Sequence, residues 1–196
     1  CGTRMPRPHR AEAGFCGGIS MTAVPKKTAP KGATPRSKAR MGAVQALYQM
    51  ELAGADVSEV VDEFERLRFN KPDDASPREE DDAAADLEEA DATFFSEIVH
   101  GVVRRQRDID PMVHEQLAAG WRLVRVDAIL RAILRAGSFE LIERRDVPGR
   151  VVINEYINVA HAFFDEDEPR VVNGVLDKIA RKLRADEFER KGSVGK

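Results

Sequence analysis

Residues 126–143 read VDAILRAILRAGSFELIE, and this stretch indicates the fold class of the whole chain. Its large apolar side chains recur three and four residues apart, at Val126, Ile129, Leu130, Ile133, Leu134, Leu141 and Ile142. Residues with that spacing share one face of a helix. We therefore expect a long, deeply buried helix here, with a core built from helices around it.

Apolar residues with the same spacing predict six further helices on either side of this one. They cover approximately residues 37–52, 57–67, 93–107, 111–120, 152–160 and 169–183. Ser37 is expected to cap the first helix and Gly54 to end it, while Asp110 and Pro111 should begin the fourth. The apolar run 151–153 merges into a helical period, so no strand is expected. The predicted fold is all-α, a compact bundle of about seven helices.

Charge is distributed unevenly along the chain. Residues 1–50 hold nine Lys or Arg and one acid, Glu12, although the net charge of the whole chain is -3. Residues 1–35 have no apolar period, so we predict a disordered basic N-terminal extension, with Met5 and Met21 as candidate starts of the native protein. Residues 71–92 contain ten acids and are interpreted as a solvated acidic linker. The folded domain is placed at 36–188 and a disordered tail at 189–196.

Composition and spacing argue against several classes of protein. No apolar run approaches the ~20 residues that span a membrane, so no membrane association is expected. Both cysteines, Cys1 and Cys16, lie in the predicted extension, which fits a reducing cytoplasm. The chain has no phosphate-binding glycine loop and no nucleophile elbow, so we expect no cofactor and no catalysis. Metal-ligand spacing is also missing around the four histidines, His9, His100, His114 and His161.

Three segments together resemble one family. Residues 38–48 read KARMGAVQALY and follow Arg36; residues 133–141 read ILRAGSFEL, followed by DVP at 146–148 and VINE at 152–155; residues 170–178 read RVVNGVLDK. In this order and spacing they resemble the NusB family of transcription antitermination factors over about residues 36–185. Departures from the family pattern are Met41 in place of an acid, Gly137 in place of a bulkier residue, Val171 in place of Phe, and the longer acidic linker.

The resemblance implies a fold, an activity and partners. The fold would be seven helices in two sub-bundles. The activity would be binding of the boxA RNA element in nascent ribosomal RNA leaders, together with NusE, a small-subunit ribosomal protein. The assembly would join RNA polymerase and suppress premature termination without catalysis. The free protein could be a monomer or a homodimer that hides its RNA surface.

Residues of the first helix fit the chemistry of single-stranded RNA, which needs phosphate neutralisation and contacts to base edges. Arg36, Lys38 and Arg40 are expected to be surface cations that bind phosphates, aided by Lys26, Lys27 and Lys31 of a basic arm at residues 21–40. Gln45 is expected to read a base edge, with a capped or solvent-facing amide as the equal alternative.

The start of the last helix supplies a second group of residues. Arg170 and Asn173 lie in its first turns, where backbone amides attract phosphate. The resemblance implies that this turn approaches the first helix and that Asp167 lies nearby. The alternatives are a capping role for Asp167 and close helix packing for Asn173 and Gly174, with packing strongly preferred for Gly174. A Phe at position 171 would stack on a base, worth ~1–3 kcal/mol, and Val171 puts that contact in doubt. The predicted RNA-binding residues are Arg36, Lys38, Arg40, Gln45, Asp167, Arg170 and Asn173.

Other motif residues are given a structural interpretation. Buried polar residues of helical cores usually satisfy one another, and we assign this role to Arg135, Glu140, Asn154 and Glu155. Trp121 could face NusE or cover the core.

Three alternative readings stay open at this stage. The chain could be a helical interaction domain related to the N-terminal domain of ribosomal RNA cytosine methyltransferases, without an antitermination role, although the polar end of the chain indicates that no catalytic domain follows. It could also be an interaction bundle with no RNA role. The acidic linker could act as an internal mimic of RNA.

Overall fold

The computed structural model describes residues 33–69, 87–117, 122–165 and 167–189, and these residues form seven α-helices with no strand among them. The helices are α1 (Pro35–Ala53), α2 (Val57–Phe64), α3 (Ala92–Gln116), α4 (Ala128–Glu143), α5 (Gly149–Phe163), α6 (Glu168–Leu183) and α7 (Ala185–Glu189). A π-helical turn, Glu65–Phe69, extends α2, and a 3-10 turn, Leu123–Arg125, precedes α4. The all-α expectation is confirmed.

Several predicted features lie outside the described residues. They are nearly all of the N-terminal extension, the greater part of the acidic linker, Trp121 and the end of the C-terminal tail. Their roles and the domain boundaries stay predictions. No helix in the part of the chain that the structure describes is long and apolar enough to cross a membrane.

The count of seven helices agrees with the expectation, but the helices differ from those expected. Pro111 lies inside α3, so the two helices predicted at 93–107 and 111–120 are one. Asp110 does not cap a helix there, because its carboxylate accepts hydrogen bonds from Arg135 on α4. Ile109 and Val113 are both buried on the same face, and this continuous apolar contact outweighs the break that proline favours. The seventh helix, α7, was not predicted.

The ends of α1 are partly as expected. Thr34 rather than Ser37 caps the helix, because the Thr34 side chain accepts a hydrogen bond from the Ser37 backbone N–H and Pro35 follows in the first turn. Gly54 ends the helix as predicted. Its φ of 64° is left-handed, and its N–H donates to the Met50 carbonyl, which is the usual glycine termination.

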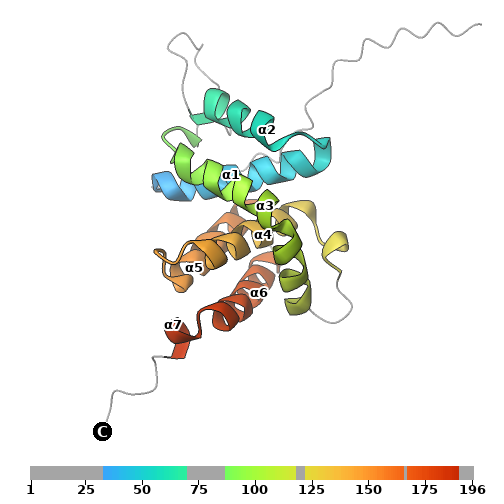
Figure 1. Ribbon diagram of the computed structural model, residues 1–196, viewed down its shortest axis with the longest axis vertical. Helices are drawn as coiled ribbons and strands as arrows, with labels where there is room; N and C mark the ends of the chain where they lie inside the picture. The colour runs from blue at the N-terminus through green and yellow to red at the C-terminus, as the bar shows by residue number, and fades with distance from the viewer. Residues whose placement is uncertain (1–32, 70–86, 118–121, 166, 190–196) are drawn as a thin grey trace, which may run out of the picture.

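Helix α4 is the centre of the fold (Figure 1). In that view α1 and α2 lie above it, α5, α6 and α7 lie below it, and α3 runs beside both groups. Residues 129–134 and 136–141 of α4 are all buried, so the helix is enclosed on every side. The chain thus forms two groups of helices that share α4 as their common core.

Two glycines permit close packing around α4. A Cβ added at Gly101 on α3 would lie 2.1 Å from the Phe139 ring, so only glycine fits there. A Cβ at Gly137 would lie 2.8 Å from Leu176 and 3.2 Å from Tyr156. This explains the small residue at 137, since α5 and α6 approach the backbone of α4 at this position.

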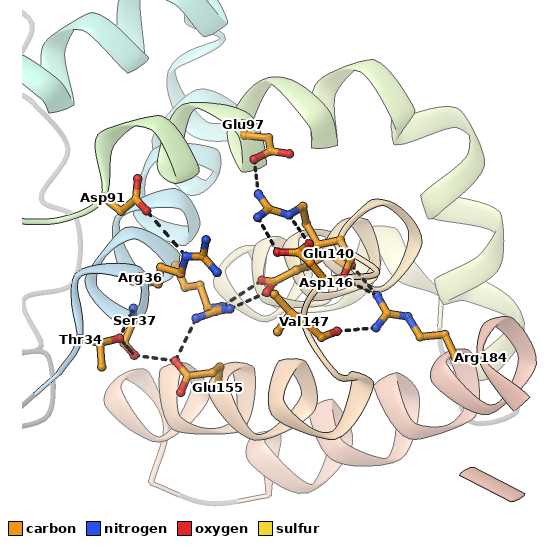
Figure 2. Close-up of polar contacts among 12 residues, drawn as sticks. Thr34, Arg36, Ser37, Asp91, Glu97, Glu140, Asp146, Val147, Glu155 and Arg184 are labelled. Atoms are coloured by element: carbon orange, nitrogen blue, oxygen red, sulfur yellow. Dashed lines mark hydrogen bonds and ion pairs between the residues drawn. The ribbon is translucent and has the colours of Figure 1, made fainter. Parts of the chain in front are cut away.

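A buried arginine joins the end of α6 to the end of α4. Arg184 has no exposed surface. Its guanidinium donates to the carbonyl oxygens of Glu140, Leu141, Arg144 and Val147 at 2.6–3.0 Å (Figure 2). The last carbonyls of a helix lack partners within the helix. Those of Glu140 and Arg144 also accept backbone N–H groups, from Arg144 and Val147, so Arg184 is needed mainly by the Leu141 and Val147 carbonyls.

Candidate nucleic-acid interface

The first turn of α1 carries two of the predicted cations, of which Arg36 is exposed and Lys38 is half-buried. The Arg36 side chain is 49% exposed, and its Nε lies 3.8 Å from an oxygen of Asp91. The Lys38 ammonium donates to the Glu88 carbonyl oxygen at 2.7 Å. The Asp91 backbone N–H also donates to the Pro35 carbonyl. The segment that leads into α3 therefore holds the cationic turn, yet leaves Arg36 open to solvent.

Arg40 is not the surface cation that we expected. It is only 3% exposed, and its Nε and Nη2 donate to the two oxygens of Glu140 at 2.9 and 2.5 Å. Its Nη1 donates to Glu155 at 3.2 Å. Residues 39–47 of α1 are all buried, so a side chain in this stretch cannot reach the surface. The expectation of a phosphate contact by Arg40 is wrong, because its donors are engaged inside the fold.

The charge of Arg40 is maintained despite its burial. Burial by itself lowers the pKa of Arg40, but the hydrogen bond to Glu140 and the surrounding negative charges raise it overall. The guanidinium therefore stays protonated and acts as a permanent link between α1, α4 and α5.

Gln45 is also placed differently from the expectation. It is 2% exposed, and its Oε1 accepts a hydrogen bond from Arg68 at 3.3 Å. An amide enclosed in this way cannot read a base edge, so the expected role is wrong. Gln45 instead connects α1 to the turn that follows α2.

The structural interpretation of the other polar motif residues holds for three of four. Glu140 and Glu155 bind Arg40, and Arg135 pairs with Asp110 and Glu51. Asn154 is exposed, which contradicts the prediction that it satisfies a buried partner.

At the start of α6, Asp167, Arg170 and Asn173 are all exposed. Asp167 occupies the N-cap position, but its side chain accepts no bond from the first turn. It pairs instead with the Arg170 guanidinium at 2.9 Å, with both side chains more than 80% exposed. Such an exposed pair contributes little to stability, so both groups are available to a ligand.

The expectation that Gly174 packs closely against a neighbouring helix is wrong. It is exposed, and a Cβ added there would meet nothing within 4 Å. Asn173 beside it is exposed too, so close helix packing explains neither residue. Val171 is half-buried and packs against the core.

Helix α5 connects the two groups of exposed residues. Its Glu155 accepts a hydrogen bond from Ser37 in the first turn of α1. At the start of α5, the Gly149 N–H donates to Glu187 of α7, which directly follows the end of α6. At the other end of α5, the chain leaves the helix at Phe163 and enters α6 at Glu168. Helices α5 and α6 are therefore antiparallel. The start of α6 therefore lies at the C-terminal end of α5.

Three residues of this region were missed by sequence reasoning. The guanidinium carbons of Arg36, Arg40 and Arg144 lie 5.0–5.2 Å from the centre of the Phe94 ring. Arg144 also pairs with Asp146 and Glu97 (Figure 2). Asp91 caps α3 by accepting from the Phe94 N–H, and its place just before a predicted helix was the one available signal. Nothing in the pattern indicated Arg144 or Phe94.

The chemistry of the exposed groups suits an anionic polymer better than a metal ion. In the described ranges no group of three or more His, Cys, Asp or Glu residues could hold a metal. Arg36 and Arg170 each present a guanidinium, which binds phosphate with paired donors. Asn173 adds an amide that can donate to and accept from a base edge.

Comparison with known proteins gives consistent results. The chain matches the NusB family model over residues 37–181. It is 49% identical over 168 residues to the transcription antitermination protein NusB of Rhodopseudomonas palustris (strain ATCC BAA-98 / CGA009), which covers 84% of this chain and 91% of the relative. It is 51% identical over 160 residues to the protein of the same name from Nitrobacter hamburgensis, with 82% and 94% covered.

Solved structures show the same fold. T. maritima NusB is similar with a TM-score of 0.63 and 26% identity, covering 80% of this chain and 98% of that one. A structure of antitermination factors NusB and NusE in complex with dsRNA is similar with a TM-score of 0.59 and 26% identity, covering 76% and 97%. Since the family match spans most of α1 to α6 and the relatives are about half identical over most of their length, the chain belongs to the NusB family.

Proposed function

We propose that this chain binds the boxA element of nascent ribosomal RNA leaders together with NusE and joins RNA polymerase in an antitermination complex. The observation that carries the proposal is the pair of exposed cationic helix starts, at α1 and α6, that α5 connects. The similar structure that contains NusB, NusE and RNA supports both partners. The relatives are named as antitermination proteins, so the protein is not an enzyme. Its place of action is then the cytoplasm.

The contacting residues that we propose differ from the sequence-based set. Arg36, Lys38 and Arg170 neutralise phosphates, and Asn173 contacts a base edge. Asp167 orients Arg170 through their ion pair. Arg40 and Gln45 are removed from the set because both are buried.

The experiment is a titration of a labelled boxA-like RNA against a scrambled RNA of equal length, with and without purified NusE. Binding of a single strand falls with salt at a log–log slope of about −0.7 per neutralised phosphate, so three cations predict a slope of about −2. A preference for the boxA-like RNA that sharpens with NusE supports the proposal. Equal, weak binding to both RNAs would favour an interaction module without an RNA role.

A matched pair of variants locates the contact on α6. Arg170→Ala should weaken binding and reduce the salt slope by about one phosphate, or ~0.7. Arg181→Ala is the control, because Arg181 is also exposed on α6 and also pairs with an acid of the same helix, Asp177. An equal loss in both variants would show a general charge effect rather than a contact at the start of α6.

A further inference from the structure

The first turn of α1 is fastened to α5 by a chain of hydrogen bonds that Figure 2 displays. The Thr34 and Ser37 hydroxyls lie 2.9 Å apart, and the Ser37 N–H donates to Thr34 Oγ1 at 3.1 Å. The Ser37 hydroxyl then donates to Glu155 Oε2 at 2.7 Å. This turn carries Arg36 and Lys38, so the contact determines where these two cations point.

Glu155 is itself held in place. The same Oε2 accepts from Arg40 at 3.2 Å, and Arg40 is bound through two hydrogen bonds to Glu140 on α4. The Glu155 side chain is 24% exposed, whereas that of Glu140 is fully enclosed. The carboxylate of Glu155 thus connects a buried ion pair to the half-buried hydroxyl of Ser37 in the first turn of α1.

Glu155 carries a negative charge next to the cationic turn, so its place there needs a reason other than charge. A carboxylate beside a turn that binds phosphates repels them and by charge alone weakens RNA binding. The first turn of a helix also frays readily, because its backbone N–H groups have no partners within the helix. A turn that is ordered before binding loses less conformational freedom when it meets a ligand.

We propose that Glu155 and Ser37 are positioning residues for RNA binding, which orient the cationic first turn of α1 without touching the RNA. The proposal rests on the function proposed above. It extends that function to α5, where Glu155 links the buried Arg40–Glu140 pair to the turn that carries Arg36 and Lys38.

Ser37→Ala is the sharpest test because it removes one hydroxyl and no charge. The Thr34 cap is kept, since Thr34 accepts from the backbone N–H of residue 37, and alanine favours the helix. The affinity for boxA-like RNA should fall about fivefold, which corresponds to about 1 kcal/mol at 1.4 kcal/mol per tenfold. Ser37→Thr keeps a hydroxyl and should restore most of the affinity.

Ser58→Ala is the matched control. Ser58 also lies in the first turn of a helix, α2, is exposed, and donates its N–H to the N-cap side chain of Asp56. Its substitution should leave RNA affinity unchanged. An equal loss in the Ser58 and Ser37 variants would overturn the proposal, because the effect would then be general.

Two further measurements separate positioning from simple stability. In the free protein, hydrogen exchange of the first turn of α1 should accelerate in Ser37→Ala while α4 and α6 stay protected. Glu155→Ala should weaken RNA binding although the protein loses a negative charge, and its circular dichroism will show that it is folded. Tighter binding by this variant would mean that Glu155 acts only through repulsion, and would overturn the proposal.

The outcomes also distinguish this proposal from the function on which it rests. If the wild type prefers boxA-like RNA and Ser37→Ala binds equally well, the positioning role is wrong and the function stands. If the wild type shows no preference for boxA-like RNA, the proposed function fails and the positioning role fails with it.

Discussion

Replacing Arg40 with methionine should destabilise the fold strongly. The substitution keeps much of the side-chain volume but removes three hydrogen bonds to carboxylates. Glu140, which has no exposed surface, would be left as a buried charge without its partner. Removal of one member of a buried ion pair costs about 3–5 kcal/mol. A domain of this kind has a free energy of unfolding of roughly 5–15 kcal/mol, so the variant would lose a large share of it.

The assay is urea unfolding followed by circular dichroism at neutral pH. The wild type, Arg40→Met, Glu140→Leu and the double variant form a double-mutant cycle. Each single variant should show a large loss, and the double variant should recover much of it, since an apolar pair can replace a buried ion pair at little cost. If Arg40→Met had the same urea midpoint as the wild type but lost RNA binding, Arg40 would be a surface contact and the argument from burial would be refuted.

Three further predictions follow from particular residues. Arg184→Met should lower the free energy of unfolding by about 2 kcal/mol or more, because it leaves the Leu141 and Val147 carbonyls unpaired and removes one of the two hydrogen bonds that each of the Glu140 and Arg144 carbonyls accepts; a loss below about 1 kcal/mol in urea unfolding would contradict this. Gly174→Ala should stabilise the free protein by about 0.4–1 kcal/mol, since the added methyl group meets nothing, and an unchanged or lower melting temperature would count against an open helix surface. The hydrogen bond from Arg144 lowers the pKa of Asp146 from 3.8 to about 2, so its stabilising effect is complete above pH 3.8 and lost as the pH falls through about 2. Asp146→Asn should therefore have a slightly lower urea midpoint than the wild type at pH 7, and the two midpoints should converge near pH 2.

The helical fold could be predicted because its signal is local. The apolar period of 126–143 indicates α4 without knowledge of its neighbours, and Gly54 marks the end of α1 by its own backbone preference. The error at Pro111 arose because local preference favoured a break, whereas contacts of Ile109 and Val113 with the core favoured a continuous helix. Helix α7 was missed because five residues carry too little periodicity to be recognised.

The candidate site was predicted in part. Arg36, Asp167, Arg170 and Asn173 are exposed, as a surface contact requires, while Arg40 and Gln45 are not. In the sequence, Arg36 and Arg40 look alike, since both are arginines near the start of one helix. They differ in burial, because other helices cover α1 at Arg40 and leave it open to solvent at Arg36.

The sequence by itself determined that the chain is helical, approximately where most of the helices lie, and where positive charge is concentrated, because these properties depend on neighbours within a few residues. The tertiary structure alone decided which charged groups face solvent and which are internal links. Arg40 meets Glu140 across 100 positions of the chain, and Ser37 meets Glu155 across 118. A helix period shows that a residue lies on a face, but the partner that covers that face is chosen by how all the helices pack together.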